Sequence, residues 1–513
     1  MLLSRLLQNF PFQISVPVED AEITGVVSDS RRVQPGNLFV AFKGSSFDAH
    51  RFIPQAVSNG ATAVIGMEAG IHPGVPYIVV EDSRRALPYL AAAFYGNPGH
   101  RLTMIGVTGT DGKTTTTNLI YQILLAAGLK AGMISTVNAV IGNQVLDTGF
   151  HVTTPDAPDV QRYLDMMVKA GITHAVLETT SHGWAQYRVD ACEFDIGVIT
   201  NITHEHLNDH GSFENYRAAK ARLFTGLAEM PEKRHVKQKL AILNRDDASF
   251  KYLSPLISVA QASYGFLPQS QVCARDVINR KDGLQFVASG PDFIMSIQSN
   301  LTGNFNVSNC LAAISVAMLG LGLAPDAIQQ GIATMPGVPG RMESIDLGQD
   351  FTAIVDFAHT PNALRCVLET ARTLTRGRVI AVFGSAGLRD KQKRRMMSET
   401  SAQLADLTIL TAEDPRTESL EDILAEMAEG AEAKGNEEGV TFWRIADRGE
   451  SIRYAVSMAK PGDIVIACGK GHEQSMCFGE VEYPWDDRTA MRAALSKLLG
   501  IPGPQMPRLP TSQ

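Results

Sequence analysis

The chain has 513 residues, of which 44% are hydrophobic and 19% are charged, and its formal net charge at pH 7 is −8. So long a chain does not fold around one hydrophobic core, and a prior of about 150 residues per domain predicts three domains. The negative charge and the absence of a dense lysine and arginine tract disfavour a protein that binds duplex DNA or RNA.

The six cysteines are scattered without C-x-x-C spacing and predict reduced thiols in a cytoplasmic protein. The N-terminal stretch is interrupted by Arg5 and Asn9 and lacks a small-residue cleavage pattern. No run reaches the ~20 apolar residues that a membrane-spanning helix needs. We therefore expect a protein that is not exported and not inserted into a membrane.

Residues 1–98 alternate short apolar runs with turn signals, which predicts a small α/β domain. Polar loops at residues 29–31 and 43–50 adjoin predicted strands, where ligand contacts tend to lie, although ordinary turns explain these loops better on this stretch alone. The Asn-Pro-Gly break at residues 97–99 predicts the end of this domain.

Residues 102–128 predict a buried strand, a tight loop and a helix in succession. The N–H groups of such a loop, the helix N-terminus, a lysine and a threonine hydroxyl together bind a polyphosphate and its Mg²⁺. The general pattern has a further glycine where this chain has Val107, and the alternative is a plain turn with a surface lysine. The residues expected to bind the nucleotide here are Gly109, Thr110, Asp111, Gly112, Lys113, Thr114 and Thr115.

Two further predicted strands of this unit end near possible metal ligands. Residues 174–178 end at Glu178, and residues 196–201 are followed closely by His206. Because the carboxyl ends of parallel strands meet at one sheet edge, we expect both side chains beside the phosphate loop. Mg²⁺ prefers oxygen ligands. Each residue alone could equally be a capping or hydrogen-bonding residue, but their clustering favours a metal site.

Two predicted helices follow. Residues 214–224 contain Lys220 among inward-facing apolar residues, and a helical lysine is usually solvated. Residues 301–323 begin with an asparagine-rich turn. Asn306 and Asn309 could cap that helix or hydrogen-bond a base edge, and capping is the default.

From about residue 337 apolar strands alternate with helical or loop stretches, which predicts a doubly wound parallel sheet. Polar residues follow four of these strands and predict a second ligand site that faces the first. Residues 501–513 are proline-rich and polar and predict a disordered tail. The expected domains are therefore residues 1–98, 99–336 and 337–500.

The motifs and their order resemble those of the Mur ligases of peptidoglycan synthesis, and within them the MurE type, which adds the third amino acid of the stem peptide. The resemblance covers nearly the whole chain. It rests on DSR with PGNLFVAFKG, GTDGKTT, TTPD, ETTSH, NITHEHLNDHG, YRAAKARLF, GNFNVSN, PGRME, VDFAHTPNAL, FGSAGLRDKQKR, EDPR and GKGHE. It implies an α/β protein with an N-terminal domain for the UDP end of the substrate, a central P-loop ATPase domain and a C-terminal Rossmann-like domain for the amino acid.

The resemblance also implies roles for individual residues. Lys113 and Thr115 would hold the ATP phosphates and Mg²⁺, and Glu178 and His206 would ligate metal. Lys220 would be carbamylated by CO₂ and become an anionic oxygen ligand. The nucleotide would contact Asn306, Asn309, Arg341 and Asp356. The muramyl dipeptide and the uridine end would contact Thr153, Thr154, Ser181, Gln186, Arg188 and Ser30. Further substrate contacts from the third domain would be Arg389, Asp414, Arg416, Gly469 and Glu473.

The implied reaction is an ATP-dependent amide ligation. A substrate carboxylate would attack the γ-phosphoryl group of ATP, while Mg²⁺ and Lys113 neutralise the developing charge. The amine of the incoming amino acid would then attack the acyl phosphate and displace phosphate. Because the sites lie on different domains, closure would align them. We expect a cytoplasmic monomer that acts on small molecules only.

The identity of the third amino acid depends on residues 413–416. The diaminopimelate enzymes typically carry Asp-Asn-Pro-Arg where this chain has Glu-Asp-Pro-Arg. Arg416 suits a bidentate grip on a carboxylate, which favours meso-2,6-diaminopimelate. The extra charge of Asp414 would suit an ammonium end, so that lysine and ornithine stay open.

Two other functions compete with this one. A folylpolyglutamate-type ligase shares the ATPase core, but the N-terminal DSR segment and the GKGHE loop oppose it. A catalytically silent nucleotide-binding regulator is opposed by the presence of Lys113, Glu178, His206 and Lys220.

Overall fold

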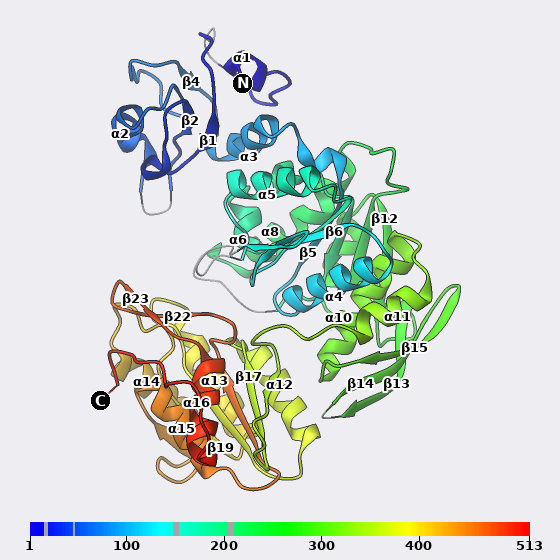
Figure 1. Ribbon diagram of the computed structural model, residues 1–513, viewed down its shortest axis with the longest axis vertical. Helices are drawn as coiled ribbons and strands as arrows, with labels where there is room; N and C mark the ends of the chain where they lie inside the picture. Colours follow the sequence, from blue (N-terminus) through cyan, green and yellow to red (C-terminus); the bar gives the residue numbers. More distant parts are fainter. Residues whose placement is uncertain (15–18, 45–46, 147–152, 204–209, 281, 513) are drawn as a thin grey trace.

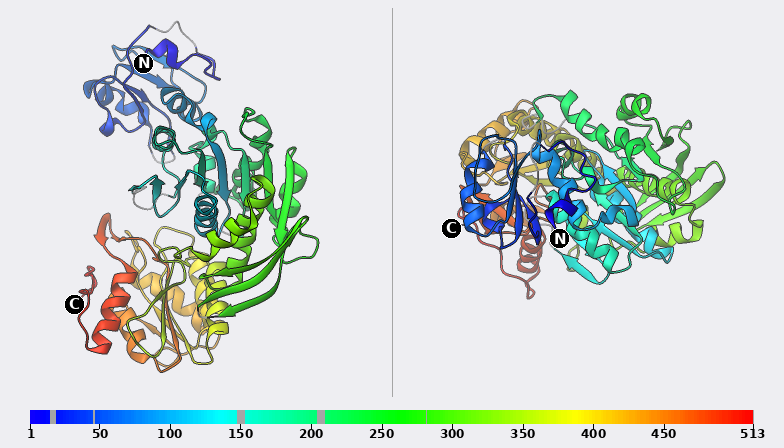
Figure 2. Two further views of the ribbon diagram at one scale, coloured as in Figure 1. Left: turned by 45° about the vertical axis from the view of Figure 1, so that its right-hand side comes forward. Right: turned by 90° about the horizontal axis from the view of Figure 1, so that it is seen from above.

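The computed structural model describes residues 1–14, 19–44, 47–146, 153–203, 210–280 and 282–512. These residues form three units, each built on its own sheet. Figure 1 shows the N-terminal unit at the top, the central unit in the middle and the third unit at the bottom. The left view in Figure 2 shows the same succession along the long axis.

The first unit is a parallel sheet with the order β1-β2-β3-β4. Successive side chains of β2 point to opposite faces, so that Leu38 and Phe39 enter different apolar clusters. Helices cover both faces, which explains why the strands read as continuous apolar runs. The elements are α1 (Leu3–Leu6), β1 (Gly25–Val27), β2 (Asn37–Val40), α2 (Ile53–Ser58), β3 (Ala63–Gly66), β4 (Tyr77–Val79) and α3 (Ser83–Phe94).

The central unit is an eleven-stranded sheet with the order β15-β14-β13-β12-β11-β10-β5-β9-β6-β7-β8. Its strands are β5 (Thr103–Thr108), β6 (Ala131–Ile134), β7 (Ala139–Ile141), β8 (Gln144–Leu146), β9 (His174–Glu178), β10 (Ile196–Ile199), β11 (Leu240–Asn244), β12 (Ala260–Gly265), β13 (Val272–Arg280), β14 (Gly283–Gly290) and β15 (Phe293–Ser299). Its helices are α4 (Lys113–Ala126), α5 (Ala157–Lys169), α6 (Ser181–Ala185), α8 (Phe213–Thr225), α9 (Ser249–Leu253), α10 (Asn304–Ser315) and α11 (Pro325–Ala333).

The register of this sheet places three strand ends together. β5 pairs in parallel with β9 on one side, with Val107 opposite Glu178, and with β10 on the other, with Thr108 opposite Ile199. Helices α4, α10 and α11 pack on one face of the sheet, and α5 and α8 pack on the other. The carboxyl ends of β5, β9 and β10 therefore meet at one edge, as the sequence predicts.

The third unit is a six-stranded sheet with the order β16-β17-β21-β18-β19-β20, in which only β16 is antiparallel to its neighbour. Its strands are β16 (Glu343–Ile345), β17 (Thr352–Asp356), β18 (Val379–Phe383), β19 (Leu407–Leu410), β20 (Phe442–Arg444) and β21 (Ile464–Cys468), with a separate hairpin of β22 (Ser475–Phe478) and β23 (Val481–Pro484). Its helices are α12 (Pro361–Leu374), α13 (Lys391–Leu404), α14 (Leu420–Glu432), α15 (Arg448–Met458) and α16 (Asp487–Leu499).

The observed architecture confirms the predicted three-part α/β fold with a doubly wound third sheet. We propose that the three sheets mark three domains with limits near residues 98 and 336. The expected disorder of the tail is not observed. Leu509 is buried, Met506 packs against the third core, and the hydroxyls of Thr511 and Ser512 donate to Asp447. These contacts outweigh the polar, proline-rich composition from which disorder was predicted.

Candidate active site

The phosphate loop joins β5 to α4 and depends on two glycines. Gly109 has φ +150° and Gly112 has φ +82°, backbone angles that residues other than glycine rarely adopt. A Cβ at Gly112 would also collide with Oδ1 of Asn309, and one at Gly109 with Oγ1 of Thr200. The loop is therefore closely packed against α10 and β10, and its helix N-terminus faces the space above the sheet edge.

Two ammonium groups contact this loop. Nζ of Lys113 donates to the carbonyl of Thr110 at 2.8 Å. Nζ of Lys220, from α8, donates to the carbonyl of Gly109 at 2.6 Å and lies 4.6 Å from the centre of the Tyr216 ring. The side chain of Lys220 is buried, so the general expectation of a solvated helical lysine is wrong here. Its position instead agrees with the role implied by the family resemblance.

Glu178 ends β9 and lies buried beside the loop. Its Oε1 accepts from the hydroxyls of Thr114 at 3.0 Å and Thr136 at 2.8 Å, and its Oε2 accepts from the Thr136 N–H at 2.9 Å. This set of carboxylate and hydroxyl oxygens fits a Mg²⁺ ion, whose preferred ligands are oxygens. Thr114, and not the expected Thr115, contacts Glu178, whereas Thr115 lines the neighbouring cavity. His206 lies outside the described residues.

A cavity of about 770 Å³ lies between the central and third units. This is the size of a typical small-molecule site. The central unit contributes the phosphate loop, Glu178 and Asn306, and the third unit contributes Arg341 and Asp356. Asn306 and Asn309 do not cap α10: the cap residue is Gly303, and the two amides bond to one another at 2.9 Å within the first turns. Both asparagines line the cavity, as the nucleotide-binding expectation requires.

Arg341 connects the two units. Its guanidinium lies 4.3 Å from the centre of the Phe357 ring, and Nη2 donates to Oγ1 of Thr114 at 3.3 Å. The carboxylate of Asp356 accepts from the N–H groups of Met342 at 2.6 Å and Ala358 at 2.7 Å. Burial raises the pKa of Asp356, and the charge of Arg341 opposes that rise.

Phe357, Asn362 and His472 also line the cavity, although none of them was among the predicted binding residues. Burial and the nearby charge of Arg341 lower the pKa of His472 to about 3, so its ring is neutral at pH 7. Each of these three residues lies one to six positions along the chain from a predicted site residue, Asp356 or Glu473. The signal that could have found them is their place directly after β17 and β21, at the same sheet edge.

The residues expected to hold the muramyl dipeptide lie together beside β9 and α6. Arg188 donates to Oε1 of Gln186 at 2.7 Å and to the carbonyl of Thr154 at 2.6 Å. The hydroxyl of Thr154 is 3.1 Å from that of Thr180, which precedes Ser181 at the start of α6. Thr153 lines the cavity, so this group continues into it.

The residues expected to contact the amino acid lie at the carboxyl ends of β19 and β21. Nζ of Lys470 is buried and lies 3.0 Å from both carboxylate oxygens of Asp414 and 2.5 Å from Oε2 of Glu473. The N–H of Cys477 also donates to Asp414 at 2.9 Å. One ammonium thus faces the two carboxylates of Asp414 and Glu473, so part of the negative charge near Asp414 is offset, and its role toward a ligand ammonium stays a prediction.

The backbone around this ion pair is unusual. Asp414 has φ +41° and Arg416 has φ +54°, a conformation that is uncommon outside glycine and often found at functional sites. Glu413 is buried against Gly469, where any added Cβ would collide with the Glu413 carboxylate. Arg416 is half-buried and forms no ion pair with any described residue, which leaves its guanidinium available for an anion.

Two of the expected substrate residues lie away from this cavity. Ser30 is in the N-terminal unit, where its hydroxyl donates to Oε1 of Gln55 at 2.9 Å. Arg389 is exposed at the start of the segment that leads into α13. Figure 1 shows the N-terminal sheet and the third sheet at opposite ends of the molecule. The structure therefore does not bring these two residues together with the nucleotide cavity.

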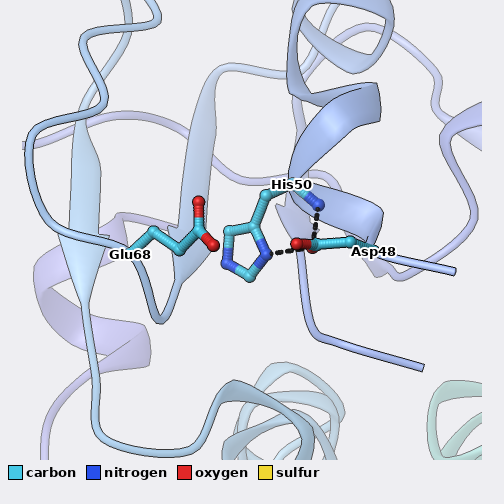
Figure 3. A group of neighbouring side chains, drawn as sticks. All are labelled: Asp48, His50 and Glu68. Atoms are coloured by element: carbon cyan, nitrogen blue, oxygen red, sulfur yellow. Dashed lines mark hydrogen bonds and ion pairs between the residues drawn. The ribbon is translucent and has the colours of Figure 1, made fainter. Parts of the chain in front are cut away.

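A second group of possible metal ligands lies in the N-terminal unit (Figure 3). One ligand atom from each of Asp48, His50 and Glu68 lies within 4.8 Å of the others. However, Nδ1 of His50 is bonded to Asp48 at 2.6 Å, and Nε2 accepts from the N–H of Met67 at 2.9 Å. Glu68 is paired with Lys43 at 2.9 Å. Because both ring nitrogens of His50 already form hydrogen bonds, we interpret Asp48, His50 and Glu68 as a structural contact and not as a metal site.

Within the described residues, no helix combines the length and the apolar composition that crossing a membrane requires.

Comparison with known proteins gives matches along most of the chain. The model of the Mur ligase family catalytic domain matches residues 22–95, that of the Mur ligase middle domain matches 107–317, and that of the Mur ligase glutamate ligase domain matches 340–471. The chain is 44% identical to the UDP-N-acetylmuramyl-tripeptide synthetase of Roseiflexus sp. (strain RS-1), with 97% of this chain and 99% of that protein covered.

Two further relatives carry a more specific name. The chain is 40% identical to the UDP-N-acetylmuramoyl-L-alanyl-D-glutamate--2,6-diaminopimelate ligase of Geobacillus thermodenitrificans (strain NG80-2), with 93% of this chain and 95% of that protein covered. A solved structure of a ligase with the same name is 31% identical, with a TM-score of 0.64 over 93% of this chain and 95% of the other.

Proposed function

Because this chain belongs to the Mur ligase family, we propose that it is the ATP-dependent ligase that joins meso-2,6-diaminopimelate to UDP-N-acetylmuramoyl-L-alanyl-D-glutamate. The observation that carries this proposal is the continuity of the interdomain cavity. Its lining includes Lys113 and Glu178, reaches Thr153 beside the dipeptide group, and reaches Glu473 beside the amino-acid group. One cavity thus adjoins all three substrates of the reaction.

ATP is proposed to bind with its phosphates on the loop and its nucleoside toward Asn306 and Asn309. Arg341 and Asp356 then approach from the third domain. Thr114 and Glu178 would hold Mg²⁺, together with His206, and the ion would supply positive charge to the phosphates. Lys113 is placed to add a second positive charge, because its Nζ already lies on the loop carbonyl of Thr110.

The reaction follows from these positions. A carboxylate oxygen of the dipeptide attacks the γ-phosphorus, ADP leaves, and the negative charge that develops lies beside the loop N–H groups and Lys113. The uncharged amine of the third amino acid then attacks the acyl carbon, and phosphate leaves with the former carboxylate oxygen. Residues Thr154, Gln186 and Arg188 hold the dipeptide so that its carboxylate faces the loop.

Lys220 is proposed to carry a carbamate. Its buried Nζ is 2.6 Å from the Gly109 carbonyl, and a carbamate nitrogen keeps one N–H for this bond while adding two anionic oxygens. Carbon-13 NMR after incubation with labelled bicarbonate tests this point. We expect a carbamate signal that is absent from Lys220→Ala, and an unmodified amine in fully active protein would refute it.

Diaminopimelate is favoured over lysine and ornithine by the charges of the third domain. Lys470 pairs with Asp414 and so offsets part of the negative charge that would attract a second ammonium group. Arg416 keeps a guanidinium that suits the second carboxylate of diaminopimelate, which lysine and ornithine lack.

The test supplies Mg-ATP and the UDP-linked dipeptide with one of the three amino acids at a time, and the product is identified by mass spectrometry. We expect the tripeptide with diaminopimelate, whereas product formed only with lysine or ornithine would overturn this choice.

The two competing functions are less well supported. A Mur ligase family model matches residues 22–95, and the alignment with the UDP-N-acetylmuramyl-tripeptide synthetase covers 99% of that protein. Both findings favour a UDP-linked substrate over a folate. Lys113, Glu178 and Lys220 all meet at the phosphate loop, which favours an active enzyme over a silent regulator. If Lys113→Ala left the biological role unchanged, the regulator would be the better explanation. A monomer that acts in the cytoplasm remains our expectation.

A further inference from the structure

The loops that follow β18 and β19 lie against one another in the third unit. The loop after β18 contains Arg389, and the loop after β19 contains Arg416. The N–H of Gly387 donates to the carbonyl of Asp414 at 3.0 Å, so the two loops are joined directly. Because β18 and β19 pair in parallel, both loops begin at the same edge of the sheet. The two arginines therefore extend from neighbouring segments of the chain.

A buried ion pair connects α13 to both loops. Arg394, in the first turn of α13, donates through both terminal nitrogens to the carboxylate of Glu418, at 2.8 and 2.7 Å. The guanidinium is fully buried, and 15% of the Glu418 side chain is exposed. Nη1 of Arg394 also donates to Glu426 of α14 at 2.9 Å. The hydrogen bonds from Arg394 hold the pKa of Glu418 down to about 2, so this carboxylate is charged at pH 7.

Glu418 also holds the backbone of the loop that contains Arg389. Its Oε2 accepts from the N–H of Leu388 at 2.9 Å. Leu388 has φ +56° and is 60% exposed, so burial of its side chain contributes little to fixing this uncommon backbone angle. Nη2 of Arg394 lies 3.5 Å from the carbonyl of Ala386, two residues earlier. One carboxylate thus binds the guanidinium of α13 and fixes the residue next to Arg389.

The loop that contains Arg416 is fixed from its other side. The N–H of Arg416 donates to the carbonyl of Cys477 at 3.1 Å, and the carbonyl of Arg416 accepts from the N–H of Gly479 at 2.8 Å. Both partners belong to the hairpin of β22 and β23. The hairpin thus holds Arg416, whereas Glu418, two residues later, connects to the loop of Arg389. The spacing of the two arginine backbones is set by contacts on both sides.

We propose that Glu418 and Arg394 are positioning residues for the third amino acid of the reaction. The inference rests on the proposed function, because it assumes that Arg389 and Arg416 both contact diaminopimelate. This ligand has two carboxylates, and a guanidinium that binds a carboxylate through two parallel hydrogen bonds needs both the right position and the right direction. The Glu418–Arg394 pair does not touch the ligand, but it keeps the loop of Arg389 at a fixed place beside Arg416.

Glu418→Ala tests this role. It removes the acceptor of the Leu388 N–H but leaves Arg394 paired with Glu426, so that the buried guanidinium keeps a partner. We expect KM for diaminopimelate to rise about 10- to 100-fold, because a small misplacement of a binding group is costly, while kcat and KM for ATP stay within about threefold. Glu418→Gln keeps a carbonyl oxygen at this place and should show a smaller rise.

Asp463→Ala is the matched control, because Asp463 forms the same kind of contact at the opposite edge of the sheet. Its carboxylate binds the guanidinium of Arg378 at 2.6 Å and accepts from the N–H of Lys460 at 2.9 Å, just before β21. Asp463 is more deeply buried than Glu418. We therefore expect Asp463→Ala to lower the melting temperature at least as much as Glu418→Ala, but to leave KM for diaminopimelate at the wild-type value.

Hydrogen–deuterium exchange of residues 386–390 reads the state of the loop without the reaction. We expect faster exchange in Glu418→Ala and unchanged exchange in Asp463→Ala. An unchanged KM or unchanged exchange in Glu418→Ala, or an equal rise of KM in Asp463→Ala, would overturn the inference. A wild-type protein that made no tripeptide with diaminopimelate would instead refute the proposed function, and the exchange pattern would then decide whether the pair holds the loop.

Discussion

Replacement of Lys470 by methionine should destabilise the third domain strongly. The ammonium is fully buried and lies 2.5 to 3.0 Å from the carboxylates of Asp414 and Glu473, whose side chains are 9% and 20% exposed. Removal of one partner from a buried ion pair costs about 3–5 kcal/mol, because the other charge is left without compensation. In a domain of this size each kcal/mol shifts the melting temperature by about 3 °C, so we expect a loss of roughly 10 °C.

Differential scanning calorimetry measures this shift, and the fluorescence of Trp443 and Trp485 in a Trp184→Phe background assigns it to the third domain. Lys434→Met is the matched control, since Lys434 pairs with Glu399 at 3.7 Å in the same domain but is 35% exposed. Exposed pairs contribute about 0–1 kcal/mol, so the control should shift by at most about 3 °C.

The double variant Asp414→Asn/Lys470→Met should recover part of the loss, because it removes one of the uncompensated carboxylates. Burial lowers the pKa of Lys470, but Glu473 and Asp414 outweigh this effect and raise it. The stabilisation by Lys470 is therefore complete below its unfolded pKa and is lost as the pH rises through the folded value. A loss below about 2 °C in Lys470→Met near pH 7 would refute a stabilising ion pair between Lys470 and these two carboxylates.

Three further changes are expected to have measurable effects. Arg416→Ala should lower kcat/KM for diaminopimelate by about 10- to 100-fold and kcat/KM for lysine by less than about threefold, since only diaminopimelate has a second carboxylate. Equal losses for the two amino acids would contradict a contact between Arg416 and that carboxylate. Burial raises the pKa of Glu413, so its ionisation opposes folding as the pH rises. In calorimetry, Glu413→Gln should therefore stabilise the protein by roughly 1–3 kcal/mol near pH 8 but little near pH 4. A gain in stability that does not depend on pH would refute this. Thr114→Ala should lower kcat by about 100-fold and Thr115→Ala by less than about tenfold in a phosphate-release assay, because Thr114, unlike Thr115, contacts Glu178; the reverse order would exclude Thr114 as the metal ligand.

The sequence predicted the sheet edge correctly because strand ends are local signals. The apolar runs before Gly109, Glu178 and Asp356 each become a buried strand, and in parallel sheets such ends must meet at one edge. The structure confirms the three-part α/β architecture that these motifs predicted, and the comparisons with known proteins confirm the family. The roles of the individual site residues remain predictions that the experiments above can test.

What the sequence could not provide is the partner of each charged side chain. Asp414 was expected to offer its charge to a ligand, and nothing in the sequence indicated that Lys470, 56 residues later, pairs with it. Lys220 was expected to be solvated because helical lysines usually are, and only the fold places its amine on the Gly109 carbonyl. The contact of Asp111 with Asn362 depends on the relative placement of two domains. Such pairings join residues distant in sequence, and no periodicity in the chain encodes them.

The most direct test of the central claim follows an oxygen atom. The UDP-linked dipeptide is prepared with oxygen-18 in the carboxylates of its glutamate and incubated with Mg-ATP and diaminopimelate, and both products are analysed by mass spectrometry. We expect a tripeptide that has lost one labelled oxygen and a phosphate that has gained it, because the former carboxylate oxygen leaves with the phosphate when the amine attacks the acyl phosphate. Unlabelled phosphate, or phosphate released without a tripeptide, would contradict it.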